Sequence, residues 1–506
     1  MKTLVLRSGV KGLGSQGFEG RRRGLVHSLR KSGVLVFLLG LTLLLGCGGG
    51  SVTPSGSNGG DGNGGSGGDG GSAGSTAVLI SLGDMAAMPG DSGPPVDQIV
   101  SFVVTIESVS VHSSSGSVQL LSNPRRFELS RNSLKHEPLL LANVARGHYS
   151  GVVIKVSNPA VSFIDSSGTL HEDVAALLTS PNETIAIPFS IGLNPVFFIL
   201  RPLLSSSVSF GGGDLVTVTP RFDTFGPVEV QNGVGIISDL VGRVTTVSGS
   251  SVTIDVNSIG YTWDPNGALT LATDSSTEFQ GVTALNELST GMTVEVDAIL
   301  YSDGTCRANR IEVENNVATA AVTEGLVRSL APSQLQMMVR EVHAPDDLTI
   351  PAVGKLLTVK ANASTQFQVE SEHVDLHNLD FTPTFDALNI AAGQNVRAAG
   401  AGGSATTFAA DQLKLEEQSL NGIGGTVNAG AVSGQFTFPL NVTADSAFAQ
   451  LTGQTSVLVT LQPGTWGSGE WGYPCISCIA ANHVRVRGLL FFSGGQYRLV
   501  AEIVGT

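Results

Sequence analysis

Three segments in the second half of the chain carry the same landmarks in the same order, which constrains the fold more than any other feature. Each opens with a Gly-x-Val strand, passes through a polar turn ending in Phe, and closes with an Ala-led strand. Apolar residues alternate in the closing strand, which places them on one sheet face. The segments are longer and less regular than solenoid repeats, so they predict separate small β-barrels. The landmarks are Gly242, Phe279 and Ala308 in the first segment, Gly325, Phe367 and Ala410 in the second, and Gly425, Phe448 and Ala481 in the third.

The composition predicts β structure for the rest of the chain as well. Val, Thr, Ser and Gly are abundant, while charged residues make up 14% and aromatic residues 6%, a balance that favours short strands and Gly-rich turns. Val100–Val111 and Tyr149–Ile164 are typical of long strands. We therefore expect an all-β protein, with a β-sandwich-like domain at 77–228 followed by three β-barrel-like repeats. Their ranges are 235–314, 322–417 and, for a divergent third repeat, 420–506.

The N-terminal segment has the features of a targeting signal. Arg21, Arg22 and Arg23 precede an apolar stretch that ends in Leu44-Leu45-Gly46-Cys47, an arrangement that resembles a bacterial lipobox. The stretch is shorter than the roughly 20 apolar residues that span a membrane. We expect residues 1–46 to be a signal peptide and Cys47 to be the lipidated mature N-terminus.

The residues after Cys47 predict a tether and a location. Residues 47–76 are rich in Gly and Ser and contain almost nothing to bury, so they predict a flexible tether with a reach of about 30 Å. The protein is expected in the bacterial cell envelope, anchored by lipid. Gly48 gives no acidic retention signal, which by analogy with enteric bacteria indicates the outer membrane.

The charge balance limits the partners. The whole chain has a formal net charge of −14, and removal of the basic N-terminal segment leaves it more acidic. Such a surface repels nucleic acid and anionic headgroups. The expected partners are the membrane, through the lipid anchor, and either an envelope protein or a polysaccharide.

Two resemblances to known families follow from these segments. The strand Leu288–Val296, the hairpin at Asp303-Gly304-Thr305 and the turn Asp274–Phe279 resemble the bacterial domain of unknown function numbered 5666. The resemblance is strongest over 235–314. Residues 77–228 resemble the domain of unknown function numbered 4382, through Val103–Val109 and Asn143–Tyr149. These families imply a secreted or lipid-anchored protein, and neither brings catalytic residues.

A candidate metal site lies in an insertion of the second repeat. In an extended strand, His373, Asp375 and His377 would share one face and offer two imidazoles and a carboxylate to one metal ion. The segment from Phe367 to Val396 is longer than its counterpart in the first repeat, and inserted loops often carry function. The alternative is that the three side chains are simply solvated.

The third repeat contains a second candidate site and a cysteine pair. Trp466, Trp471 and Tyr473 could stack on sugar rings as a ligand-binding surface, or they could plug one end of a barrel. Cys475 and Cys478 have thioredoxin spacing without a βαβ context, and a zinc site would need a second cysteine pair. They predict a local disulfide. Cys306 is expected to be a small buried residue.

No residue pattern identifies a reaction, and none implies a cofactor. The expected function is therefore a non-enzymatic envelope lipoprotein that acts as a ligand-binding or adhesion module, with a glycan among its candidate ligands. One alternative is a structural spacer or assembly component that binds another envelope protein. The other is a hydrolase whose site assembles from residues far apart in sequence.

Overall fold

The computed structural model describes residues 74–83, 96–121, 123–130, 136–212, 215–256, 268–315, 320–344, 352–371, 373–467 and 474–506. It contains 62% strand and 5% helix, so the all-β class is confirmed. The predicted signal peptide and Cys47 lie outside these residues. Within them, no helix is long and apolar enough to cross a membrane.

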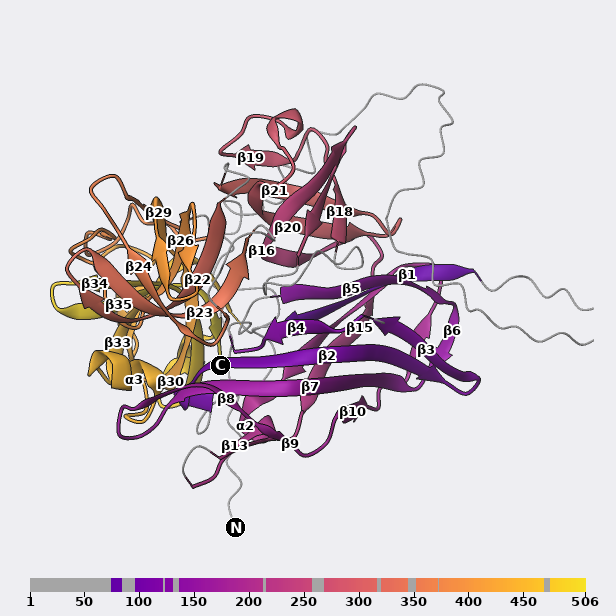
Figure 1. Ribbon diagram of the computed structural model, residues 1–506, viewed down its shortest axis with the longest axis horizontal. Helices are drawn as coiled ribbons and strands as arrows, with labels where there is room; N and C mark the ends of the chain where they lie inside the picture. Colours follow the sequence, from indigo (N-terminus) through magenta and orange to yellow (C-terminus); the bar gives the residue numbers. More distant parts are fainter. Residues whose placement is uncertain are drawn as a thin grey trace, which may run out of the picture. The chain divides into compact units, whose positions relative to one another are not determined.

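The N-terminal part is built from two principal sheets that share one hydrophobic core (Figure 1). The first sheet, in spatial order, contains β15 (Phe222–Glu229), β12 (Val196–Pro202), β1 (Ser75–Gly83) and β5 (His136–Ala145). The second contains β10 (Asn182–Ile185), β7 (Gly151–Ile164), β2 (Ile99–Ser113) and β3 (Gly116–Leu121), with β4 (Arg125–Glu128) and β8 (Leu170–Ala175) attached. Val78 and Phe198 meet Phe102 and Ile154 in the core.

Short elements complete this part. They are η1 (Val96–Gln98), β6 (Gly147–Tyr149), β9 (Leu177–Leu178), β11 (Phe189–Ile191), α2 (Leu204–Ser207), β13 (Val208–Phe210) and β14 (Val216–Val218).

Three further sheets follow along the chain, here called the first, second and third barrels. The first contains β16 (Gly233–Ser248), β17 (Ser251–Asp255), β18 (Ala268–Ala272), β19 (Glu278–Gln280), η3 (Leu285–Glu287), β20 (Thr293–Tyr301) and β21 (Cys306–Asn315). The second contains β22 (Ala321–Ala331), β23 (Gln334–His343), β24 (Leu356–Lys360), β25 (Gln366–Val369), β26 (Asn395–Gly400), β27 (Gly403–Ser404), β28 (Thr407–Ala409) and β29 (Gln412–Leu415). The third contains β30 (Glu417–Gly424), β31 (Asn428–Ala429), β32 (Phe436–Asn441), α3 (Ala447–Thr452), β33 (Ser456–Gly467), α4 (Ile476–Ile479), β34 (His483–Ser493) and β35 (Gln496–Gly505).

The three barrels have the same connectivity. In each, the first main strand lies between the second and the fourth, and the third pairs in parallel with the fifth to close the sheet. This is the connectivity of a five-stranded Greek-key barrel of the OB type. The first strand of the third barrel begins at Glu417, which is the last residue of the range 322–417 expected for the second repeat.

A glycine in the first strand allows each barrel to close tightly. A Cβ atom would lie 2.8 Å from the carbonyl oxygen of Asp255 if added to Gly242, 2.1 Å from that of Met338 at Gly325, and 2.5 Å from that of Asn441 at Gly422. The neighbouring strand could not approach so closely past any other residue. The expected Gly425 is therefore replaced by Gly422 as the third copy.

A buried threonine in each barrel identifies the turn and the closing strand of the third repeat, which differ from the predicted ones. Thr277 and Thr365 donate 2.8 Å hydrogen bonds to the carbonyls of Ala308 and Ala410, the alanines of the closing-strand pattern, and Thr465 donates a 2.8 Å bond to the carbonyl of Ala501 within β35. The third-copy turn is thus the one that contains Thr465 and Trp466, with Gly467 in the place of Phe. The predictions based on Phe448 and Ala481 are wrong, because Phe448 lies in α3 and Ala481 precedes the fourth strand.

Each barrel has its own group of buried side chains, with shared residues where barrels meet. Leu415 lies in the core of the second barrel and Val486 in that of the third, while Val313 is partly buried against the core of the first. Leu489 and Phe491 of the third barrel also join the core of the second. The barrels therefore pack against one another through apolar as well as charged groups.

Candidate functional site

The most unusual feature of the interior is a group of charged side chains where the three barrels meet, here called the junction network. It is connected by ion pairs, and acidic groups outnumber basic ones. Its cations are Arg310, Arg397, Lys414 and Arg487; its carboxylates are Asp239, Glu295, Asp297, Glu312, Glu314, Glu324, Glu370, Glu416, Glu417 and Glu502.

Arg397 is the centre of the network and its side chain is only 2% exposed. Its Nη1 lies 2.6 Å from Glu295 Oε2, 3.1 Å from Glu314 Oε2 and 3.2 Å from Glu416 Oε1. Its Nη2 lies 3.2 Å from Glu324 Oε2. Because Glu295 and Glu314 belong to the first barrel, this guanidinium joins the first and second barrels.

Lys414 and Arg310 extend the same junction. Lys414 Nζ lies 2.7 Å from Glu314 Oε1 and 3.1 Å from Glu312 Oε1, and it also pairs with Glu370. Arg310 donates to Glu295, Asp297 and Glu312 over 3.1, 2.9 and 2.8 Å. The carboxylates of the first barrel are thus shared between its own arginine and the cations of the second barrel.

Arg487 connects the third barrel to the first. One of its nitrogens, Nη2, lies 2.7 Å from both Asp239 Oδ2 and Glu417 Oε2, while Nε lies 3.0 Å from Glu502 Oε2. His373 of the second barrel reaches the same Asp239, with Nε2 3.2 Å from Oδ1. Asp239 therefore receives contacts from two other barrels.

Burial changes the protonation of the carboxylates in the junction network. Burial raises the pKa of Glu312 to about 7 against the opposing charge of Lys414. Burial also raises the pKa values of Glu416 and Glu417 well above their usual range. Burial lowers the pKa of His373, but the hydrogen bond and charge of Asp239 outweigh that effect and raise it to about 11. Bound protons thus offset part of the excess negative charge at neutral pH.

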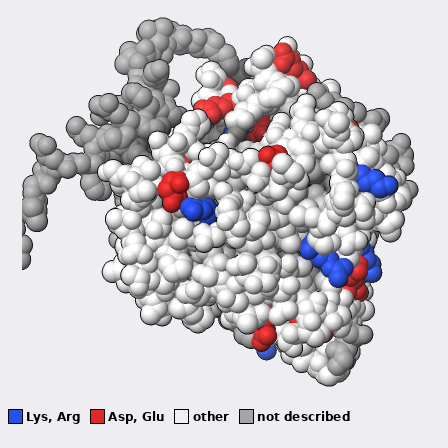
Figure 2. Space-filling model, turned by 90° about the vertical axis from the view of Figure 1, so that its left-hand side faces the viewer, with Lys and Arg blue, Asp and Glu red and all other residues white. Residues whose placement is uncertain are grey.

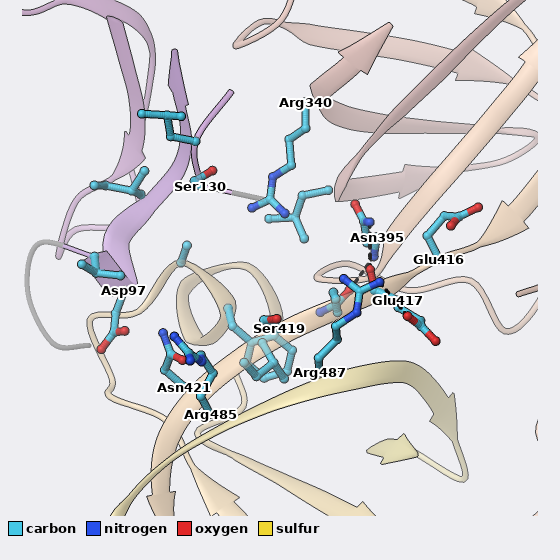
Figure 3. Close-up of a pocket in the computed structure, with 18 of the residues that line it drawn as sticks. Asp97, Ser130, Arg340, Asn395, Glu416, Glu417, Ser419, Asn421, Arg485 and Arg487 are labelled. Atoms are coloured by element: carbon cyan, nitrogen blue, oxygen red, sulfur yellow. Dashed lines mark hydrogen bonds and ion pairs between the residues drawn. The ribbon is translucent and has the colours of Figure 1, made fainter. Parts of the chain in front are cut away.

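A polar cavity of about 170 Å³ adjoins the junction network (Figure 3). Its labelled lining residues come from the N-terminal part and from the second and third barrels: Asp97, Ser130, Arg340, Asn395, Glu416, Glu417, Ser419, Asn421, Arg485 and Arg487. Several of these groups already bind one another or the backbone. Arg487 pairs with Glu417, and Arg340 Nε donates 2.8 Å to the Val100 carbonyl. Some of the lining groups are therefore already engaged in contacts that join these elements.

Two groups in the network have ligand atoms close enough to hold a cation. In Glu295, Glu312, Glu314 and Glu370 these atoms lie within 4.8 Å of one another, as they do in Asp239, Asp297 and His373. In the first group the ammonium of Lys414 already contacts three of the four carboxylates. In the second, Arg310 and Arg487 contact Asp239. A metal ion would have to displace these internal cations.

The structure does not bring His373, Asp375 and His377 to one metal site. The segment is not a strand, and Val374 and Leu376 anchor it in the core of the second barrel. His373 turns inward to Asp239, whereas the His377 side chain is 93% exposed and 3.8 Å from Asp375. The shared face expected from sequence is lost because the chain bends at its apolar anchors.

The aromatic candidates and the cysteines lie in the third barrel. Trp466, near the end of β33, is 53% exposed, so it does not plug the barrel. Trp471 and Tyr473 fall outside the described residues. Cys475 and Cys478 are joined in a disulfide across α4. Cys306 is buried in the core of the first barrel.

Sequence reasoning did not identify the junction network, although a signal was present. Charged residues alternate with apolar ones in Arg310–Glu314 and Lys414–Glu416, and again in Arg485–Arg487. Alternation alone is equally typical of a strand with one solvated face. Only the packing of three such faces against one another shows that both faces are buried.

Comparison with known proteins assigns one part of the chain. The family model described as domain of unknown function (DUF5666) matches residues 241–312, from within β16 to within β21 of the first barrel. A search of curated proteins finds no match.

Proposed function

We propose that this protein is a lipid-anchored, non-enzymatic binding or adhesion module of the bacterial cell envelope. In this proposal Cys47 carries the anchor, residues 47–76 form the tether, and the β domains beyond it present a ligand-binding surface. The DUF4382 resemblance of 77–228 and the repeat of the 5666 domain belong to the same proposal.

The charged interior supports a structural rather than a catalytic role for the junction network. Arg397 and Lys414 each contact at least three carboxylates, and these contacts cross between barrels. A general acid or base must reach a substrate. Glu416 and Glu417 line the polar cavity, but each is paired with a buried cation, Arg397 or Arg487, that holds the barrels together.

The exposure of Trp466 is the single observation that carries the binding function. Large aromatic side chains are usually buried, and an exposed one offers a rigid apolar face with a polar edge. At 53% exposure, Trp466 leaves about half of its side chain open to a ligand. We infer that the third barrel contributes the ligand-binding surface.

A pull-down of envelope components with the purified full-length protein tests this function. The proposal predicts capture of a polysaccharide or envelope protein, and loss of that capture in Trp466→Ala. Leu388→Ala is the matched control, since Leu388 is 91% exposed and lies in another loop. Equal capture by both variants would contradict a role for Trp466, and turnover of the captured component would contradict a non-enzymatic function.

A further inference from the structure

We propose that the insertion of the second barrel and the loops of the third form one binding surface for an uncharged polysaccharide. We call it the composite surface, and it comprises Asp375, His377, Phe436 and Trp466. The inference rests on the proposed binding function and assigns the ligand class to it.

Two glutamines of the third barrel hold the insertion beside the aromatic residues. The Gln462 side chain makes two hydrogen bonds to the backbone of Asp375: its Oε1 accepts from the amide over 3.0 Å, and its Nε2 donates to the carbonyl. Gln435 likewise donates to the carbonyl of Asn378. Gln435 directly precedes Phe436, and Gln462 begins the turn that ends at Trp466. These contacts bring residues from two barrels to one place.

The strand register puts the two aromatic residues at the same end of the third barrel. Phe436 begins β32 and lies opposite Leu461 of the antiparallel β33, next to Gln462. Trp466 follows after the turn, near the end of β33. Phe436 is 38% exposed and Trp466 is 53% exposed. The apolar faces of sugar rings stack on such rigid rings.

The insertion supplies hydrogen-bonding groups at this place. Val374 and Leu376 are anchored in the core of the second barrel, so Asp375 and His377 are left with side chains 53% and 93% exposed. Asn378 Nδ2 and the His377 amide donate to separate oxygens of the Asp375 carboxylate over 2.9 and 2.8 Å. They lower its pKa and fix its direction. Each carboxylate oxygen keeps capacity for a sugar hydroxyl donor.

The electrostatics favour an uncharged ligand over an acidic one. The nearby Arg498 lies 3.2 Å from Asp380 and stacks over Phe381, so its charge is already balanced. Figure 2 views the left-hand side of Figure 1, where the second and third barrels lie, and shows small clusters of charged groups of both signs on a mainly uncharged surface. With Asp375 ionised within it, the composite surface would repel a polyanion.

Affinity electrophoresis of the full-length protein in detergent tests the inference. Native gels contain dextran, mannan or laminarin as uncharged probes, and dextran sulfate as the charged counterpart. We expect retardation by at least one uncharged probe and none by dextran sulfate. Trp466→Ala should weaken binding about tenfold or more, as loss of a central aromatic contact does. Asp375→Asn and Phe436→Ala should weaken it less, and Leu388→Ala should bind as the wild type does.

The outcomes separate this inference from the function on which it rests. Equal retardation of wild type, Trp466→Ala and Asp375→Asn would overturn the composite surface while leaving a binding function. Retardation by dextran sulfate alone would overturn the uncharged ligand. If no probe retards the wild type while the pull-down captures an envelope protein through Trp466, the ligand class is wrong and the binding function stands. Unchanged thermal melting of the variants shows that they remain folded.

Discussion

Replacement of Arg397 by Gln removes the central cation of the junction network. Four carboxylates would lose their contacts at 2.6–3.2 Å, two from the first barrel and two from the second. Arg397 and Glu295 are 2% and 1% exposed, so water cannot replace the guanidinium. Breaking a buried pair in this way costs about 3–5 kcal/mol.

Urea unfolding of the full-length protein, followed by far-UV circular dichroism, measures this cost. The matched control is Arg307→Gln, which breaks a 2.8 Å pair with Asp303 whose side chains are 38% and 51% exposed. That surface pair is worth about 0–1 kcal/mol. The deficit of Arg397→Gln should be smaller at pH 5.5 than at pH 8, because the carboxylates left behind take up protons. If Arg397→Gln costs no more than the control, the network does not stabilise the junction.

Three further predictions concern pH, backbone packing and the anchor. Above about pH 6.5 the free energy of unfolding should fall as the pH rises: Glu312, with its pKa raised to about 7, loses the proton favoured in the folded state up to about pH 7, and His373, with its pKa raised to about 11, loses its favourable charge between about pH 6.5 and 11. Below that range His136, whose pKa burial lowers to about 4, opposes the trend. Urea titrations from pH 6.5 to 9 measure this slope, and a rise in stability with pH there would contradict it. Gly325→Ala should cost about 1–3 kcal/mol, since its Cβ would lie 2.1 Å from the Met338 carbonyl, whereas Gly212→Ala, with open space around it, should change the urea midpoint little. Cys47→Ser should release the protein from the membrane fraction, and detergent-dependent membrane association of that variant would exclude Cys47 as the anchor.

The sequence predicts the fold class and the repetition because both depend on local pattern. Alternation in the closing strands and the glycines of the opening strands are visible in the chain, and Gly242 and Gly325 do occupy the close approaches between strands. The landmarks of the third repeat are predicted wrongly because its turn has Gly467 after Trp466, at the position where the other two turns have Phe. Its buried Thr465 is recognisable only from the hydrogen bond to Ala501.

The candidate site is less accessible to sequence reasoning because it depends on packing between distant segments. Arg397 and Glu295 are 102 positions apart, and their 2.6 Å contact follows from the meeting of two barrels. Likewise, Asp375 reaches the third barrel only through Gln462, which lies 87 positions away. No periodicity within a strand encodes such contacts.

The most direct test of the account compares two variants, Glu312→Gln and Trp466→Ala, by their ligand binding and their urea unfolding curves. It asks whether the interior charges are structural and whether the binding surface lies on the outside. Gln resembles the protonated form of Glu312, so that variant should fold with a shifted pH dependence and bind the captured envelope component normally. Trp466→Ala should unfold as the wild type does and lose at least about tenfold in binding. Loss of binding in Glu312→Gln, with full binding in Trp466→Ala, would contradict the account.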